Sequence, residues 1–139
     1  MNIDQIMTRK IIKIGMDDDV RTVRDLFDEH SFHHLLVVEG GRLVGVISDR
    51  DLLRNASPFI GKLSERTQDT ERLNRRVHQI MTRKPVTISS EMNVEDAAQI
   101  MLEHGVSCLP VAMEDGHVVG IVTWRDLLRS LHSLSVESG

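Results

Sequence analysis

The ten residues "GIVTWRDLLR" at 120–129 decide the fold, because nearly the same ten, "GVISDRDLLR", stand at 45–54. A second block, "QIMTRK", occurs at 5–10 and again, letter for letter, at 79–84. Matching blocks at both ends of an aligned stretch define an internal repeat. Each copy has about 50 residues, which is too few for a comfortably stable domain. We therefore expect two copies that pack into one shared core.

Both copies show the same order of apolar patterns. Short apolar runs at 11–14 and 85–88 predict a first strand in each copy. Apolar residues at helical spacing follow, and Asp19 and Asn93 precede them as N-caps. The helical positions are Val20, Val23 and Phe27 in the first copy, and Val94, Ala97 or Ala98, and Met101 in the second.

The second half of each copy predicts a hairpin and a closing helix. Two apolar runs flank a glycine-containing turn, and the "RDLLR" block follows as a helix. In the second copy, Leu127, Leu131 and Leu134 would form the packing stripe of that helix. The predicted hairpin strands are 35–38 and 43–48 in the first copy, and 109–112 and 118–123 in the second. Each copy therefore reads strand, helix, strand, strand, helix, which is an α/β (α+β) fold.

The polar segment between the copies matches neither of them, and Ser57-Pro58 interrupts any helix at its start. The predicted organisation is a first repeat at 1–55, a connector at 56–76, a second repeat at 77–134 and a C-terminal tail at 135–139.

Composition excludes several classes of protein. The chain has 139 residues, of which 40% are hydrophobic and 27% charged, as in a folded soluble domain. A net charge of −4 and four aromatic residues argue against binding of nucleic acid. No apolar run approaches the roughly 18 residues of a membrane span, and no signal peptide is evident. The single cysteine suits a reducing compartment, so a cytoplasmic protein is expected.

The pair Thr123 and Asp126 has two interpretations. As N-cap and third residue of a helix, they form a capping box that implies no ligand. Alternatively, the helix start is an anion site, with the hydroxyl on a phosphate, the carboxylate on ribose hydroxyls and Arg125 as a cation. Gly120 would then let the ligand approach the strand closely.

The repeated blocks resemble the CBS-domain family, as a tandem pair called a Bateman module. The matching stretches are "IMTRKPVTI", "HGVSCLPV" and "GIVTWRDLL" in the second copy, and "IMTRKIIKI", "HSFHHLLVV" and "GVISDRDLL" in the first. The resemblance implies two repeats about a pseudo-two-fold axis, with clefts between them for AMP, ADP, ATP or S-adenosylmethionine. It also implies a homodimer that regulates another protein, and no attached enzyme is expected. The "ASP" connector at 56–58 is similar to that of acetoin-utilisation CBS proteins.

The resemblance assigns ligand contacts in both copies. Thr123 and Asp126, with Ser48 and Asp51, would hold ribose and phosphate, and the adenine would pack between the first strand and the segment before the middle strand. The predicted contacts are Pro85, Val86, Thr87, Ser107, Cys108, Leu109, Pro110, Val111, Thr123, Arg125 and Asp126 in the second copy, and Ile12, His33, Ser48, Arg50 and Asp51 in the first.

The second copy is the better candidate. The first has Ile11 in place of Pro85, Lys13 in place of Thr87, and "HHLL" in place of "SCLP". We therefore expect a non-enzymatic sensor that needs no cofactor and binds an adenosine ligand in the inter-repeat cleft, chiefly at the second copy. The alternative is an interaction module whose clefts stay empty.

Two other kinds of site have less support. His30, His33 and His34 suggest a metal-responsive module, but structural zinc sites usually include thiolates, and Cys108 is the only cysteine. His104 and Cys108 are separated by Gly105, which marks a helix end. No nucleophile motif or phosphate-binding loop occurs. We therefore predict neither a metal site nor catalysis.

Overall fold

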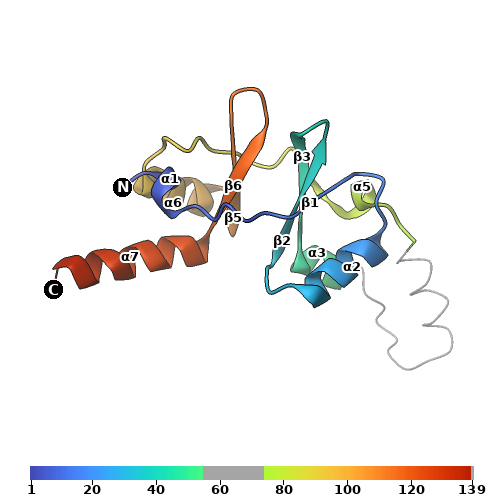
Figure 1. Ribbon diagram of the computed structural model, residues 1–139, viewed down its shortest axis with the longest axis horizontal. Coiled ribbons are helices and arrows are strands. Elements are labelled where there is room, and N and C mark those ends of the chain that lie inside the picture. Colours follow the sequence, from blue (N-terminus) through green and yellow to red (C-terminus); the bar gives the residue numbers. More distant parts are fainter. Residues whose placement is uncertain (55–73, 139) are drawn as a thin grey trace. The chain divides into compact units, whose positions relative to one another are not determined.

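The computed structural model describes residues 1–54 and 74–138, and for residues 133–138 the backbone alone (Figure 1). Most of the predicted connector, including its "ASP" stretch, therefore lies outside the described residues. The elements of the first copy are α1 (Ile3–Ile6), β1 (Lys13–Ile14), α2 (Val20–Glu29), β2 (His34–Glu39), β3 (Arg42–Ser48) and α3 (Asp49–Arg54). Those of the second copy are α5 (Val77–Ile80), β4 (Thr82–Arg83), α6 (Val94–His104), β5 (Cys108–Ala112), β6 (Val118–Thr123) and α7 (Trp124–Ser138).

The predicted helices and their caps are confirmed. The Asp19 carboxylate accepts the Thr22 amide at 2.9 Å, and the Asn93 side chain accepts the Asp96 amide at 2.8 Å. Val20 and Val23 are buried on α2, and Ala97 and Met101 on α6. Gly105 ends α6 in the left-handed conformation, with φ of 63°, as glycine allows at this position.

The predicted hairpins are confirmed, whereas the first strands are shorter than expected. β2 and β3 are neighbours in a sheet of order β1-β2-β3-β4, and β5 pairs antiparallel with β6. The run at 85–88 forms only a parallel bridge between Ile88 and Val111. Pro85 has no amide hydrogen to donate, and Lys84 before it has a φ of 48°, so these two residues do not join a regular ladder.

The two compact units of the chain do not coincide with the two sequence repeats. Unit one contains Met1–Ile11, Gly41–Leu43 and the residues from Pro85 onward, and unit two contains Ile12–Gly40 with the described residues of Val44–Lys84. The opening segment of each copy contains its "QIMTRK" block and comprises residues 1–11 in the first copy and 77–84 in the second. Each of these segments belongs to the unit that holds the hairpin of the other copy, and we call them the exchanged segments.

The same exchange appears in the strands. In unit two, β4 pairs with β3 through Thr82 and Val46. In unit one, the matching place is taken by Thr8, which bridges to Ile121 of β6. The exchange therefore completes both sheets in the same way.

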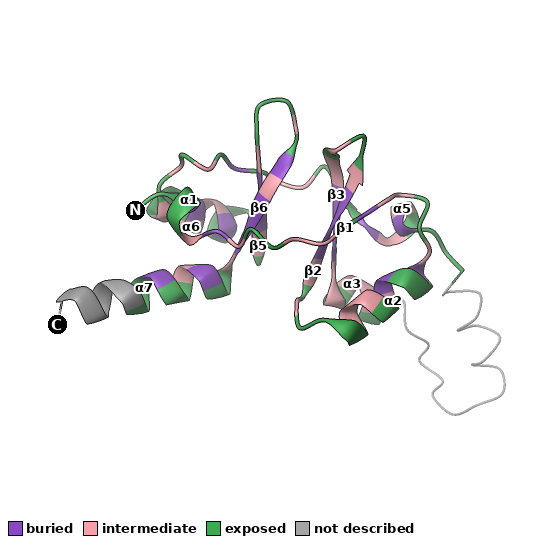
Figure 2. Ribbon diagram, viewed as in Figure 1, coloured by how far each residue is buried: buried purple, intermediate pink, exposed green. Residues whose placement is uncertain are grey.

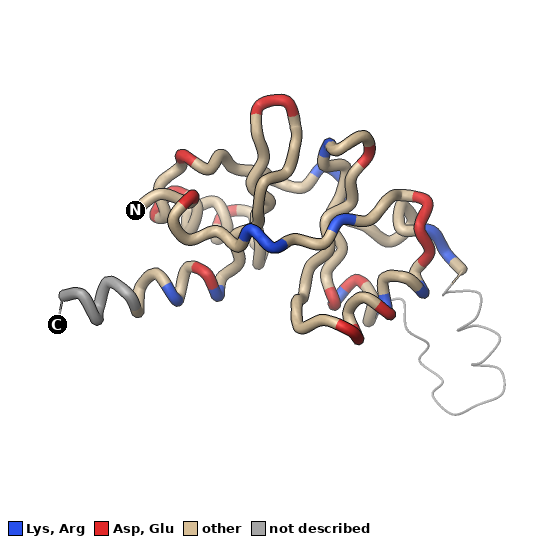
Figure 3. The backbone as a smooth tube through the Cα atoms, viewed as in Figure 1, with Lys and Arg blue, Asp and Glu red and all other residues tan. Residues whose placement is uncertain are grey.

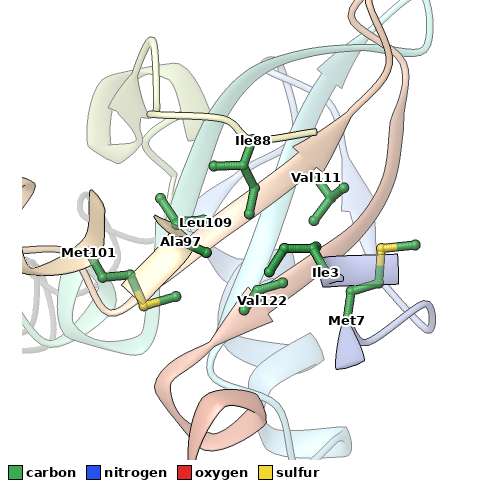
Figure 4. Packing of buried hydrophobic residues seen from close by; sticks show 8 residues of the cluster. All are labelled: Ile3, Met7, Ile88, Ala97, Met101, Leu109, Val111 and Val122. Carbon is green, nitrogen blue, oxygen red and sulfur yellow. The ribbon is translucent and has the colours of Figure 1, made fainter. Parts of the chain in front are cut away.

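Most of the buried apolar residues of the described chain form two clusters, one within each unit. Ile3 and Met7, from the exchanged segment, lie against Val111 and Val122 in unit one (Figure 4). The full cluster is Ile3, Met7, Ile88, Ala97, Met101, Leu109, Val111 and Val122. In unit two, Val77 and Met81 occupy the corresponding places beside Ile47. Each small core is thus completed by the other copy's opening segment, because one copy alone supplies too little apolar surface.

One packing prediction is wrong. Leu127 packs against the core of unit one, but Leu131 is 61% exposed, and the side chain of Leu134 lies outside the described residues. Among the described side chains of α7, at positions 124–132, the buried ones are instead Asp126 and Ser130. These two positions are four residues apart, so they lie on one helix face. Figure 2 shows buried stretches on the described part of this helix.

Candidate functional site

The candidate site forms where β6 ends and α7 begins. Thr123 is the last residue of β6, and Asp126 is the third residue of α7. The Thr123 amide donates to Asp126 Oδ2 at 2.9 Å, and the Thr123 hydroxyl donates to the same oxygen at 3.3 Å. The carboxylate therefore reaches back to the N-cap residue, which confirms the predicted helix cap.

Asp126 is nearly inaccessible, with 2% of its surface exposed. Its second oxygen, Oδ1, accepts the Thr8 hydroxyl at 3.0 Å and lies 3.4 Å from Arg129 Nη1. A buried carboxylate requires such partners, because an unpaired charge away from water is costly. The cap of α7 is thus tied to the exchanged opening segment through Thr8.

The first copy repeats this geometry in unit two. The Ser48 amide donates to Asp51 Oδ2 at 2.8 Å, and the Asp51 amide donates to the Ser48 hydroxyl at 3.2 Å, so both halves of a capping box are present. Arg54 Nη1 lies 3.9 Å from Asp51 Oδ1. The Asp51 side chain is 13% exposed, compared with 1% for that of Asp126.

Gly120, which was expected to admit a ligand, and its counterpart Gly45 in the first copy are instead packed against the chain itself. A Cβ on Gly120 would lie 2.9 Å from both the Thr8 carbonyl oxygen and Met7 Sδ. A Cβ on Gly45 would lie 2.5 Å from Met81 Sδ and 3.0 Å from the Thr82 carbonyl oxygen. Both positions thus need glycine because the exchanged segment runs across the strand.

Several residues predicted for the second site lie beside the cap. Cys108 is paired with Thr123 across the hairpin, and the Trp124 amide donates to the Ser107 carbonyl oxygen at 3.2 Å. The exposed residues Trp124 and Arg125 follow, with the Arg125 guanidinium carbon 5.5 Å from the centre of the Trp124 ring. The structure therefore brings Ser107, Cys108 and the start of α7 together.

Other predicted contacts lie in the core. Leu109 and Val111 have no exposed surface, Pro110 is buried, and Val86 is partly buried against the same cluster. Ile12 packs in the same way against the core of unit two. At Leu109, Pro110 and Val111 only backbone groups could meet a ligand, whereas Val86 and Ile12 keep part of their side chains accessible.

Thr87 lines a different hollow of unit one. This open depression of about 900 Å³ runs past Met7 and Thr87 to the turn of the β5–β6 hairpin, near Glu114 and Asp115. Figure 3 shows that this turn is acidic. Along β6, the turn and Thr123 are separated by about 15 Å of strand. The depression therefore does not contain the Thr123–Asp126 pair.

The start of α3 in the first copy carries more negative charge than the start of α7. Asp49 occupies the position that Trp124 has in the second copy. Its Oδ2 lies 2.9 Å from His33 Nδ1. His33 is thus engaged by a carboxylate, and Arg50 is exposed on the same turn. Burial lowers the pKa of the neighbouring His34. An anionic ligand would approach the carboxylate of Asp49 at the start of α3. The matching position at the start of α7 is the uncharged Trp124.

Thr8 is the residue of this site that sequence reasoning missed. Its signal was the identity of the two "QIMTRK" blocks, which exceeds what a surface segment requires. By position in the sequence, each block belongs to its own copy. In the fold, each block lies in the unit that contains the hairpin of the other copy.

No cluster of three or more histidine, cysteine, aspartate or glutamate residues able to hold a metal ion occurs in residues 1–54 and 74–138. Within the same ranges, every helix is too short or too polar to cross a bilayer.

In both copies a hairpin is followed by a helix that a hydroxyl and a carboxylate cap. This repeated unit defines a class of small paired modules. The model of the CBS domain matches residues 3–57 and 77–133, so this chain belongs to the CBS-domain family and carries two copies of the domain. A CBS domain-containing protein of Dictyostelium discoideum is 36% identical over 128 residues, which cover 91% of this chain and 88% of that protein.

Solved structures show the same fold. A crystal structure of CBSX2 in complex with AMP has a TM-score of 0.80 and 26% identity, and the match covers 96% of this chain and 98% of that one. CBSX2 is a CBS-pair protein from Arabidopsis thaliana. The Vibrio cholerae protein AcuB, assigned to acetoin utilization, has a TM-score of 0.79 at 19% identity, with 99% of this chain and 96% of that one covered. That likeness concerns the fold.

Proposed function

We propose that the chain is a regulatory module, without catalytic activity, that binds an adenosine-containing ligand at the start of α7. The observation that carries this proposal is the grouping of Thr123, Arg125 and Asp126 beside Ser107 and Cys108. The helix start offers backbone amides to a phosphate, and the exposed Arg125 adds a permanent positive charge. A carboxylate such as that of Asp126 is a suitable acceptor for ribose hydroxyls.

The second copy is proposed as the principal site. The first turn of α3 holds both Asp49 and Asp51, whereas the first turn of α7 holds Asp126 alone. An additional exposed carboxylate repels phosphate, so the first copy binds an anionic ligand less well. AMP bound to CBSX2 supports an adenosine ligand as the class. We extend this class to AMP, ADP, ATP and S-adenosylmethionine.

The proposed role is that of a cytoplasmic sensor for a partner protein. A ligand that binds one arrangement of the module more tightly than another shifts the population toward it and changes the surface that the partner meets. The hydroxyl and the carboxylate of the site are already bonded to each other, so they do not form a nucleophile with a free base. This arrangement supports binding and not catalysis.

We also propose that two chains associate through their closing helices. Leu128 and Leu131 of α7 are 53% and 61% exposed, and Leu53 in the matching helix of the first copy is 71% exposed. Exposed leucines at matched places suit a symmetric contact between identical chains. Light scattering should give twice the mass of one chain, and Leu128→Glu should halve it. A wild-type protein that stays monomeric at high concentration contradicts this association.

The binding proposal is tested by titration with AMP, ADP, ATP, S-adenosylmethionine and NAD. Trp124 is the only tryptophan and lies in the cap, so its fluorescence should change as the second site fills. A rise in melting temperature should accompany binding. Asp126→Ala should abolish the response, and Asp51→Ala, the matched control, should weaken it less. Flat responses across the panel at millimolar ligand would remove the proposal in favour of an empty interaction module, and the reverse ranking of the two variants would move the site to the first copy.

A further inference from the structure

The acceptor positions of Asp126 are already occupied in the folded chain. Oδ2 takes the amide and the hydroxyl of Thr123, and Oδ1 takes the hydroxyl of Thr8 and faces Arg129. A carboxylate has about four lone-pair positions. With 2% of the residue exposed, a ribose hydroxyl can be accepted only after one of these donors leaves.

Thr8 is the hydrogen-bond donor that can leave without breaking the helix cap. The Thr123 bonds form that cap, so their loss would unwind the start of α7. Arg129, whose side chain is 73% exposed, makes an ion pair with Oδ1 that contributes little and does not hold the cap. Within the described residues, Thr8 is the only donor to Asp126 from elsewhere, 118 positions away in the sequence. Rotation of its side chain removes the hydroxyl while the backbone stays in place.

The backbone of Thr8 fixes the opening segment to β6. Its amide donates to the Ile121 carbonyl oxygen at 2.8 Å, and the Ile121 amide donates to the Thr8 carbonyl oxygen at 2.9 Å. Ile3 and Met7 of the same segment are buried in the core of unit one. The hydroxyl bond to Asp126 therefore adds to a larger set of contacts that hold residues 1–11.

We propose that the Thr8 hydroxyl and the ligand's ribose compete for Asp126 Oδ1. This inference rests on the proposed adenosine site and adds its regulation: an occupied site loosens residues 1–11, and a firmly docked segment opposes the ligand. Coupling between two binding events is reciprocal, so whatever weakens one strengthens the other. Ligand binding at the site therefore changes how firmly α1, which lies within residues 1–11, is held.

The test is the affinity of three variants for AMP, followed by Trp124 fluorescence. Thr8→Val removes the hydroxyl and keeps the side-chain size. It should bind AMP about fivefold or more tightly than the wild type. Thr8→Ser keeps the hydroxyl, and Thr82→Val makes the same change at the matching position of the other copy, so both should bind AMP with wild-type affinity.

Three results separate the inference from the function on which it rests. Binding to the wild type, with equal or weaker binding to Thr8→Val, overturns the competition alone. Absence of binding to both proteins overturns the proposed function and the competition with it. If Thr8→Val does not fold, hydrogen exchange on the wild type decides: the Thr8 amide should exchange several-fold faster with saturating AMP, and unchanged or slower exchange overturns the inference.

Discussion

The Thr8 hydroxyl donates to Asp126 Oδ1 at 3.0 Å, joining two residues 118 positions apart. One belongs to the opening "QIMTRK" block and the other to the closing "RDLLR" block. This bond ties the exchanged opening segment to the helix cap that we propose as a ligand site. Changes in either residue should therefore affect both stability and binding.

Replacing the two cap carboxylates should destabilise the chain unequally. Asp126→Ala leaves the Thr8 hydroxyl and the Thr123 amide without their acceptor in a buried place, which should cost about 1–3 kcal/mol of unfolding free energy. Asp51→Ala, at a more exposed carboxylate, should cost about 1 kcal/mol, as for loss of an ordinary cap. Urea unfolding measures both values. Equal losses would show that burial and the Thr8 bond add nothing to the cap.

Alanine at either strand glycine should destabilise its unit. Gly120→Ala and Gly45→Ala each place a Cβ against the backbone of an exchanged segment, at a cost of about 1–3 kcal/mol. Gly15→Ala is the matched control, because its Cβ would meet its nearest neighbour at 3.6 Å, an ordinary contact. Melting temperatures should fall for the first two variants and stay near wild type for the control. A stable Gly120→Ala protein would contradict the close packing of Thr8 on β6.

Removal of a core side chain from the exchanged segment should be costly. Ile3→Ala deletes fully buried atoms that lie against Val111 and Val122, and should cost about 2–4 kcal/mol. Leu102→Ala, at a leucine 78% exposed on α6, should change stability by less than about 0.5 kcal/mol. Guanidinium unfolding compares the two variants. A small effect at Ile3 would mean that the opening segment is not part of the core.

Stability should fall in mildly acidic solution because of His34. Burial lowers the pKa of His34 from its ordinary value of 6.5, while Asp49 and Asp51 raise it and His33 lowers it further. Between the folded and unfolded pKa values, the unfolded chain binds more protons, so unfolding free energy decreases as pH falls below about 6.5. His34→Gln removes this contribution. The difference in unfolding free energy between variant and wild type should therefore change with pH, and parallel curves would exclude the effect.

The regular elements could be predicted from local patterns. Val20 and Val23 at helical spacing, Asp19 and Asn93 as caps, and Gly116 in the hairpin turn each act within a few residues, so one copy contains the whole signal. The hydroxyl and carboxylate of the cap were found for the same reason. Their bond spans three residues.

The rest depends on contacts that a linear pattern does not contain. Nothing near Thr8 indicates Asp126 as its partner, and Gly120 looks like a place for a ligand until Met7 and Thr8 are seen to fill it. The exchange of the opening segments is likewise absent from the linear pattern. A repeat shows that two copies exist, but it does not show which copy keeps each segment.

The ligand site at the start of α7 is tested most directly by amide NMR spectra of the chain titrated with AMP. A ligand site at the start of α7 predicts saturable shifts at Ser107, Trp124 and Arg125, with smaller shifts at Asp49 and Arg50. Amides around the acidic hairpin turn, such as Glu114, should not move. A spectrum unchanged at millimolar AMP, or shifts confined to the start of α3, would contradict a ligand site at the start of α7.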